Sequence, residues 1–278
     1  MSSYLRPTKI EQALSALTGG GKTIIAGGTD IYPARVGQLI EESVVDVTAI
    51  DGLRVIENCG DHYFIGAAAT WTDLIRAELP EWFNGMKMAA REVGGVQIQN
   101  AGTIVGNICN ASPAADGFPG LLTLNATVKL ASTNGERFLP IDEFVLGNRN
   151  TARKPDEMVL GLQIPVLDEN SKGTFIKLGA RKYLVISIVM VSAILTKSPE
   201  GKVKSFRIAV GSCSEVAKRL TLLEEDLIGK TVKEGLCELV TPDHLSMLKP
   251  IDDIRGTADY RNDVSLTLVR RAISELTG

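Results

Sequence analysis

The chain has 278 residues, of which 44% are hydrophobic and 23% are charged, as is typical of a globular protein with a sizeable core. A formal net charge of −3, a pI of about 5.6 and an aromatic content of 5% argue against nucleic acid and acidic membranes as partners. The four cysteines lie far apart without a CxxC pair, and the two histidines have no partner pattern, so we expect no iron–sulfur cluster or zinc site in this chain. Any redox chemistry would therefore need an organic cofactor.

Neither the N-terminus nor the most apolar run predicts passage through a membrane. The N-terminal segment MSSYLRPTKIEQ lacks the apolar core of a secretory signal. Residues 184–195 (LVISIVMVSAIL) are far fewer than the roughly 18–20 residues that span a bilayer, and they predict a buried strand or core helix. We expect a cytoplasmic protein with no membrane partner.

The first elements alternate between helix and strand. Residues 8–11 (TKIE) fit a capping box, and apolar residues at helical spacing follow, which predicts a short amphipathic helix. Residues 23–26 (TIIA) predict a strand, and residues 27–30 (GGTD) predict a sharp turn after it. Residues 31–40 are expected to begin a helix, with Pro33 tolerated only in its first turn.

Residues 16–23 (ALTGGGKT) match a loosened form of the phosphate-loop motif. That loop must follow a strand and open a helix, because the helix N-terminus holds the phosphates. Here the predicted order is helix, loop, strand, and Lys22 would begin a strand. We therefore disfavour a nucleoside triphosphatase, whereas the turn at 27–29 follows a strand and has the correct order for a backbone cradle around an anion or pyrophosphate.

Two more strands and two helices precede the central segment. Thr70 opens one helix in capping-box fashion, and Pro80 stops it. Trp71 and Trp82 are expected to pack in the core rather than contact a ligand. The predicted strands are 43–47 and 62–66, and the second helix is 82–93.

The segment from Asn100 to Gly120 (NAGTIVGNICNASPAADGFPG) is rich in Gly, Ala, Ser and Asn. Gly102 and Gly106 permit close backbone approach, and Asp116 is its only charge. We predict a long loop that holds a large polar ligand through backbone N–H groups, in preference to an ordinary surface loop.

The rest of the chain predicts a hairpin, a linker and a separate α/β unit. Asn134-Gly135 marks the hairpin turn, and alternating apolar residues at 158–164 predict a half-buried strand. Polar residues 167–173 predict a linker and a domain boundary. Beyond it, the strand candidates are 175–178, 184–195 and 203–210, and the helix candidates are 220–228 and 264–276.

Four stretches together carry a resemblance to a known family. They are AGGTDIY at 26–32, GTIVGNICNASPAAD at 102–116, FIKLGARKYLVIS at 175–187 and IDDIRGTADYRNDV at 251–264. In order and spacing they resemble the FAD subunit of the molybdenum hydroxylases, the family of xanthine dehydrogenase, carbon monoxide dehydrogenase and nicotinate dehydrogenase. The resemblance covers essentially the whole chain.

This resemblance implies an α+β fold. Residues 1–168 would form the FAD-binding region, with two subdomains at about 1–54 and 55–168 that resemble the vanillyl-alcohol oxidase type. Residues 169–278 would form a small α+β C-terminal domain. FAD would lie between the two N-terminal subdomains.

The resemblance also implies the site residues, all of which would bind the cofactor. A first stretch would wrap the diphosphate and flavin, and a second stretch would form another cradle. Asp116 would accept hydrogen bonds from the sugar or adenine. Leu162 would contact the cofactor, and Lys177 would lie near the flavin or phosphates. The first stretch is Ile24, Ile25, Ala26, Gly27, Gly28, Thr29, Asp30 and Ile31. The second is Gly102, Thr103, Ile104, Val105, Gly106 and Asn107.

Three positions depart from the family pattern. Val105 replaces a glycine, so either its dihedral angles are ordinary or the stretch is shaped differently and FAD affinity is reduced. Gln99 stands where Arg is common, and Val185 stands where Asp is common. Neither of the last two changes a residue with an expected catalytic role.

The resemblance implies a subunit that relays electrons through FAD and contributes no nucleophile, base or metal site of its own. A [2Fe–2S] subunit and a molybdopterin subunit would be its partners in a heterotrimer, with NAD+ or another oxidant as acceptor. Two alternatives stay open, a self-contained flavin oxidase of the same fold and a non-catalytic assembly module that lost FAD. Tyr183 and Tyr260 are candidates for covering a face of the flavin ring, although core packing is favoured for both, and Cys109 is expected to be a small buried residue rather than a redox group. We expect FAD to bind non-covalently, since no His or Cys of the two stretches other than Cys109 is an evident attachment point.

Overall fold

The computed structural model describes residues 3–38 and 40–278 and divides into two compact units. Unit 1 takes its described residues from 1–77, 96–111 and 125–166, and unit 2 takes 78–95, 112–124 and 167–278. The last segment of unit 2 begins at the linker predicted from the sequence. Its two earlier segments come from the part of the chain that the sequence assigned to the FAD-binding region.

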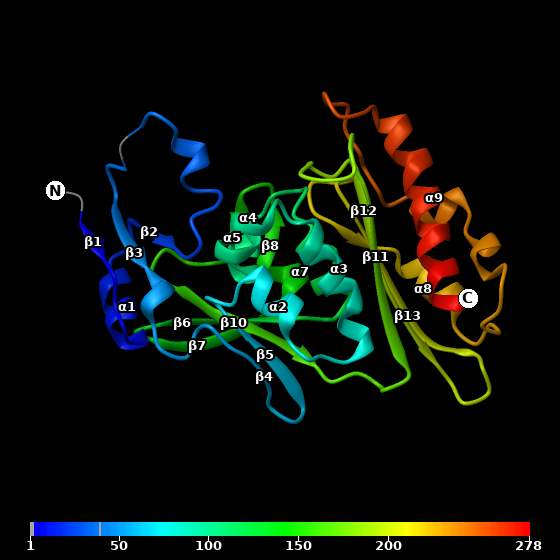
Figure 1. Cartoon of the computed structure of the whole chain (residues 1–278), viewed down its shortest axis with the longest axis horizontal. Coiled ribbons are helices and arrows are strands. Elements are labelled where there is room, and N and C mark those ends of the chain that lie inside the picture. Colours follow the sequence, from blue (N-terminus) through cyan, green and yellow to red (C-terminus); the bar gives the residue numbers. More distant parts are fainter. Residues whose placement is uncertain (1–2, 39) are drawn as a thin grey trace. The chain divides into compact units, whose positions relative to one another are not determined.

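Unit 1 contains a three-stranded parallel sheet in the order β1-β3-β2 and a five-stranded antiparallel sheet in the order β4-β5-β10-β6-β7 (Figure 1). A short hairpin, β8–β9, lies outside both sheets. The strands are β1 Tyr4–Leu5, β2 Lys22–Ile25, β3 Ser43–Asp46, β4 Ile56–Asn58, β5 His62–Gly66, β6 Thr127–Ser132, β7 Gly135–Pro140, β8 Val145–Gly147, β9 Asn150–Thr151 and β10 Met158–Pro165.

The predicted capping residues set the starts of the unit 1 helices, except that one cap lies one residue later than predicted and one expected helix is much shorter. Thr70 caps α2 as predicted, since its side chain accepts the Asp73 N–H at 3.1 Å and Asp73 accepts the Thr70 N–H at 2.9 Å. For α1 the cap lies one residue later than predicted, and Gln12 rather than Glu11 accepts the exposed N–H groups. The helix expected at 31–40 is only a single 3-10 turn over Pro33–Arg35, and residue 39 lies outside the described residues. The helices are α1 Ile10–Leu17, α2 Trp71–Arg76, α4 Val96–Ala101, α5 Ile104–Asn110 and α7 Ile141–Phe144.

The prediction of one long loop from Asn100 to Gly120 was wrong, because most of this segment is helical. Thr103 caps α5 by accepting the Gly106 N–H at 2.9 Å. Ile104 and Ile108, one helical turn apart, bury one side of α5, and Ala111 ends the helix in the left-handed conformation with φ of 48°. The Gly, Ser and Asn content of the segment concealed this short apolar stripe.

Unit 2 is built on an antiparallel sheet in the order β11-β12-β13-β14. Figure 1 shows α3 on one face of this sheet and α8 and α9 on the other. Their bounds, with the remaining elements of the unit, are α3 Asn84–Glu92, α6 Gly117–Thr123, α8 Thr221–Leu227, α9 Ala258–Thr277, β11 Ser171–Leu178, β12 Val189–Lys197, β13 Val203–Gly211 and β14 Lys218–Arg219.

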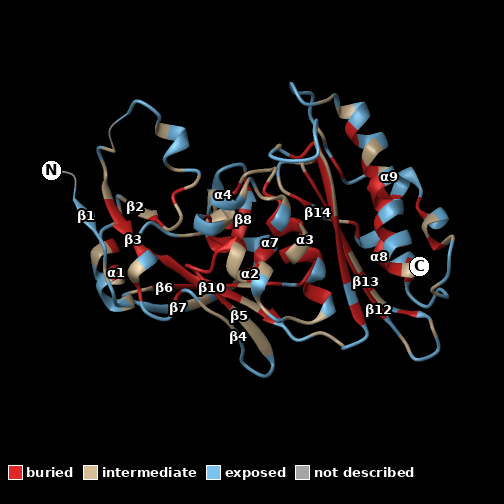
Figure 2. Ribbon diagram, in the orientation of Figure 1, coloured by how far each residue is buried: buried red, intermediate tan, exposed pale blue. Residues whose placement is uncertain are grey.

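The covered faces explain the most apolar run of the chain. In β12 every residue from Val189 to Thr196 is buried, which Figure 2 shows as a continuous red strand. Met190 packs with Ala89 of α3, whereas Val191 belongs to the cluster that includes Val269 of α9. A strand buried on both faces needs no polar alternation. Within the described ranges, no helix combines the length and apolar character needed to cross a membrane.

Candidate cofactor site

The two stretches expected to hold the cofactor meet directly in unit 1. Strand β2 delivers the chain to Gly27, where a Cβ would lie 1.9 Å from the carbonyl oxygen of Ala101, the residue before the second stretch, and 2.8 Å from the Cα of Gly102, its first residue. Thr29 also reaches the second stretch, since its Oγ1 would lie 3.2 Å from a Cβ at Gly102. Only glycine at position 27 allows this contact between two backbones.

The other side of the first turn is covered by an aromatic ring. Gly28 has a φ of +69°, and a Cβ there would lie 2.4 Å from Cε2 of Tyr32. The Tyr32 N–H donates to the Gly28 carbonyl at 3.1 Å, which closes the turn under the ring. The turn is therefore held between Ala101 and Tyr32.

The second stretch is fixed against the start of α2. The Trp71 N–H donates to the Gly102 carbonyl at 3.2 Å, and the Ile104 N–H donates to the Ala69 carbonyl at 3.1 Å. Trp71 is 1% exposed, as the sequence predicted, so this attachment lies in the core. These bonds join the second stretch to the start of α2.

Most N–H groups of the second stretch already have acceptors within the chain. These bonds are Gly102 to Ile98 O at 2.7 Å, Ile104 to Ala69 O at 3.1 Å, Gly106 to Thr103 Oγ1 at 2.9 Å and Asn107 to Thr103 O at 3.0 Å. A backbone cradle at this stretch was our expectation. In this structure the side chains are the better candidates for ligand contact.

Asn107 supplies a polar atom that fits a bound group. Its side-chain Oδ1 is buried and has no hydrogen-bond partner among the residues that the structure describes. An unsatisfied buried acceptor costs about 1–3 kcal/mol. A ligand that presents an O–H or N–H to this oxygen would remove that cost. Val105, two residues earlier, lies in ordinary helical conformation, so its β-branched side chain imposes no backbone strain.

In unit 2, Asp116 and Lys177 are bonded to each other. Lys177 Nζ donates to Asp116 Oδ2 at 2.7 Å and to the Glu92 carbonyl at 3.2 Å. The Ser187 hydroxyl donates to Asp116 Oδ1. The two charged side chains are only 5% and 10% exposed, so they form a buried ion pair with its polar atoms largely satisfied.

Burial dominates the electrostatics of this pair. Removal of the Asp116 carboxyl from water raises its pKa above the ordinary value, and the Lys177 ammonium and the Ser187 hydroxyl oppose this change only in part. The carboxylate therefore depends on both partners. Loss of either donor would favour its protonated form.

Three expected packing residues are exposed in the structure. The Leu162 side chain is fully buried in β10, and its contact with the cofactor stays a prediction. Tyr183 and Tyr260 were expected in the core but are 63% and 47% exposed. Cys109 was expected to be buried but lies exposed on α5. In each of these three cases the side chain projects from a turn or the outer side of a helix, which residue type alone does not reveal.

Sequence reasoning gave no role to two residues that complete these arrangements. Tyr32 directly follows the first turn, and its position in AGGTDIY was the available signal. Ser187 ends the stretch FIKLGARKYLVIS, but nothing in the sequence indicates that it reaches a carboxylate 71 residues away. Among residues 3–38 and 40–278, no group of three His, Cys, Asp or Glu side chains is arranged to hold a metal ion.

Comparison with known protein families identifies the family to which this chain belongs. Residues 1–167 match the family model described as the FAD binding domain in molybdopterin dehydrogenase, and residues 174–276 match the CO dehydrogenase flavoprotein C-terminal domain. The two domains are thus those of an FAD-binding component of an oxidoreductase. The chain belongs to the family of FAD-binding domains of molybdopterin dehydrogenases, and its cofactor is FAD.

Similar proteins extend along the whole chain. The glyceraldehyde dehydrogenase medium chain of Sulfolobus acidocaldarius is 29% identical over 99% of this chain and 98% of its own length. The xanthine dehydrogenase FAD-binding subunit of Escherichia coli O157:H7 is 26% identical over 99% and 95%. A chain in the structure of carbon monoxide dehydrogenase from Hydrogenophaga pseudoflava, in a form that lacks the Mo-pyranopterin moiety, matches with a TM-score of 0.88 at 26% identity, covering 100% of this chain and 98% of that one.

The residues present fit FAD. Gly27 and Gly28 let the first turn pack against the Ala101 backbone and the Tyr32 ring, which fixes the shape of the backbone that would face a cofactor. The Asn107 oxygen, which lacks a partner among the described residues, matches the hydroxyl and N–H donors that FAD carries.

Proposed function

We propose that this chain is the FAD-carrying electron-transfer subunit of a multi-subunit molybdenum hydroxylase. The observation that carries the proposal is the contact of Gly27 with the backbone of Ala101 and Gly102, which brings the two family stretches together within unit 1. In the proposed fold, residues of about 1–54 and 55–168 are the two FAD-binding subdomains of the vanillyl-alcohol oxidase type, and unit 1 contains most of them.

Each part of the cradle has a separate task in this proposal. The backbone from Ile24 to Ile31 binds the diphosphate and orients the flavin, and Thr103 and Asn107 bind through their side chains. Bound FAD supplies the capacity to exchange electrons one or two at a time, and the chain supplies orientation, electrostatic setting and exclusion of water. The family resemblance alone assigns Asp116 to the sugar or adenine and Lys177 to the flavin or phosphates; in unit 2 these two side chains form a buried ion pair.

The partners follow from the relatives. Several similar proteins are named as medium chains of dehydrogenases or as the medium subunit of a hydroxylase. We infer that a [2Fe–2S] subunit and a molybdopterin subunit accompany this chain in a cytoplasmic heterotrimer. Electrons from a substrate oxidised on the molybdenum subunit would reach FAD through the iron–sulfur subunit and leave to NAD+ or another acceptor.

The first experiment is purification of the tagged chain from its native host without overexpression. We expect the two-band absorption of oxidised flavin, FAD in the supernatant after acid precipitation, and two co-purifying chains that contain iron and molybdenum. A lone flavoprotein that reduces oxygen with its own organic substrate would instead support the self-contained oxidase. A colourless chain that FAD titration leaves unchanged would support the assembly module.

A further inference from the structure

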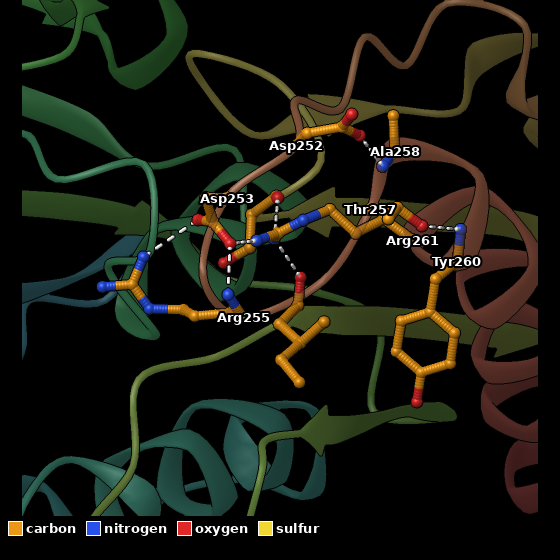
Figure 3. A network of polar contacts seen from close by, with 9 residues as sticks. Asp252, Asp253, Arg255, Thr257, Ala258, Tyr260 and Arg261 are labelled. Atoms are coloured by element: carbon orange, nitrogen blue, oxygen red, sulfur yellow. Dashed lines mark hydrogen bonds and ion pairs between the residues drawn. The ribbon is translucent and has the colours of Figure 1, made fainter.

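Two arginines of unit 2, Arg261 and Arg207, differ in how their charge is satisfied. Arg261 of α9 is 3% exposed, and its guanidinium donates to three oxygens (Figure 3). These are the Ile188 carbonyl at 2.6 Å, the Ser212 carbonyl at 2.9 Å and Asp253 Oδ1 at 2.7 Å. Such bonds replace the hydration that a buried guanidinium loses.

Arg207 of β13 has no such acceptor. It is half-buried, and its side chain makes no hydrogen bond or ion pair with residues 3–38 and 40–278. Side-chain nitrogens that lack both a partner and contact with solvent occur at Arg35 and Arg261 but not at Arg207, so its guanidinium reaches the surface. Arg207 is therefore a recessed cation that another molecule can contact.

The nearby carboxylate of Glu224 is already bonded to other groups. Its Oε1 accepts the Ile208 N–H at 3.0 Å and Arg219 Nε at 2.9 Å, and its Oε2 accepts Arg219 Nη2. Burial and, after it, the positive charge of Arg219 lower the pKa of the Arg207 guanidinium to about 10, and Glu224 opposes them only in part. Arg207 thus stays charged at neutral pH without an ion-pair partner of its own among the described residues.

Arg207 lies at an edge of the unit 2 sheet, on the face opposite α9. Phe206 and Ile208 belong to the apolar cluster that includes Val269 of α9, and the alternation of side chains along a strand turns Arg207 toward the other face. Strand β14 pairs with β13 only at residues 209 and 210. In the part of the chain that the structure describes, no strand therefore flanks Arg207 on this edge.

The free donors of Arg207 select a carboxylate. A guanidinium presents parallel N–H donors that match the two oxygens of a carboxylate, and one positive charge balances one negative charge. A phosphate dianion would need further donors, but Arg219 is bonded to Glu224, and the Ser205 hydroxyl donates to Thr196 Oγ1 at 2.9 Å. A carboxylate therefore fits this position better than a phosphate.

We propose that Arg207 binds an aspartate or glutamate side chain of a partner subunit when the complex assembles. The inference rests on the proposed function, in which this chain is one of several subunits. A half-buried cation without a partner destabilises the isolated chain, and a carboxylate from a partner subunit replaces the water that this cation has lost. The inference gives a subunit contact to a strand that carries no residue of the four family stretches.

The test uses the complex that co-purifies with the tagged full chain from its native host, immobilised through the tag, and measures the rate at which partner chains are released. Arg207→Gln is expected to speed this release about 10- to 100-fold. Arg207→Lys keeps the charge but not the planar fork, so its rate should lie between those of Arg207→Gln and the unchanged chain. The matched control is Lys204→Gln, which removes one positive charge from the same strand, because Lys204 already binds Asp168 Oδ2 at 2.8 Å. The control should release partners at the unchanged rate.

The second readout is the free energy of unfolding of the full chain alone, measured in urea. Arg207→Gln should leave this free energy unchanged or raise it, whereas Arg261→Gln should lower it, because only Arg261 has acceptors within the described chain. An equal loss in the two variants would show that Arg207 supports the fold, and it would overturn the inference.

Two further results would also overturn the inference. One is release of partner chains from Arg207→Gln at the rate of Lys204→Gln. The other is stabilisation of the unchanged chain by phosphate beyond that by acetate at equal ionic strength, lost in Arg207→Gln, because it would identify a site for a free anion. Co-purification of the unchanged chain without any partner is a different result, which would overturn the proposed function and this inference with it.

Discussion

Gly27→Ala tests the cradle at its closest contact. The added methyl group would lie 1.9 Å from the Ala101 carbonyl oxygen, 2.6 Å from its carbon and 2.8 Å from the Gly102 Cα. All three atoms belong to the backbone, so no side chain can rotate out of the way.

The size of the effect follows from these distances. Real Cβ contacts essentially never fall below 3.0 Å, so the two stretches must separate by about 1 Å. Overpacking of this kind costs about 1–3 kcal/mol of stability. A cradle that is open by this amount no longer contacts the cofactor from both sides, and we expect FAD affinity to fall about 10- to 100-fold, which corresponds to about 1.4–2.8 kcal/mol.

The assay is a titration of FAD-stripped protein, followed by flavin fluorescence, together with the free energy of unfolding in urea. Gly85→Ala is the matched control, because a Cβ there would lie 2.7 Å from the Thr174 carbonyl oxygen in unit 2. Both variants should lose stability, but only Gly27→Ala should lose substantial affinity. Wild-type affinity in a folded Gly27→Ala protein would refute the close-contact cradle.

Three further changes test single residues. Asn107→Leu should leave the free energy of unfolding of the FAD-free chain unchanged or raise it by about 1 kcal/mol while FAD affinity falls about tenfold, because the buried oxygen has no partner among the described residues; parallel losses in urea unfolding and FAD titration would contradict this. Val105→Gly restores the family glycine but should lower unfolding free energy by about 2–3 kcal/mol without tightening FAD binding, because buried Val105 is helical and unstrained; tighter binding in the same assays would show that the valine distorts the cradle. Burial raises the pKa of Glu157, but hydrogen bonds from Arg137 and the Lys154 N–H outweigh it and leave this pKa below the ordinary value of 4.5. The ionised Glu157 carboxylate therefore stabilises the fold fully above pH 4.5, and this contribution is lost as the pH falls through its lowered pKa. The free energy of unfolding should accordingly drop less steeply on acidification in Glu157→Gln than in the unchanged chain. Identical pH profiles of the two proteins would exclude the effect.

Local chemistry made much of the fold predictable. The Thr70 capping box, the turn at Asn134-Gly135 and the burial of Trp71 and Trp82 each depend on residues close in sequence or on bulk. The run 184–195 was predicted as buried, which holds from Val189 onward in β12, where helices cover both faces of the sheet; the prediction was wrong for Leu184 and Ile186, which lie exposed in the loop before the strand.

The remainder depends on contacts that sequence spacing does not encode. Helix α5 was missed because a seven-residue helix rests on one cap and a short apolar stripe inside a polar segment. The bonds from Lys177 and Ser187 to Asp116 join residues 61 and 71 positions apart. Family resemblance supplied the first stretch as a candidate, but only the structure shows that Gly27 touches Ala101.

Hydrogen–deuterium exchange with and without FAD tests the central claim most directly. The account predicts that FAD added to the stripped full chain slows amide exchange most in residues 24–31, with weaker protection over 102–107, where several N–H groups already have acceptors in the chain. Strong binding of FAD with protection confined to other segments would contradict a cradle formed by these two stretches.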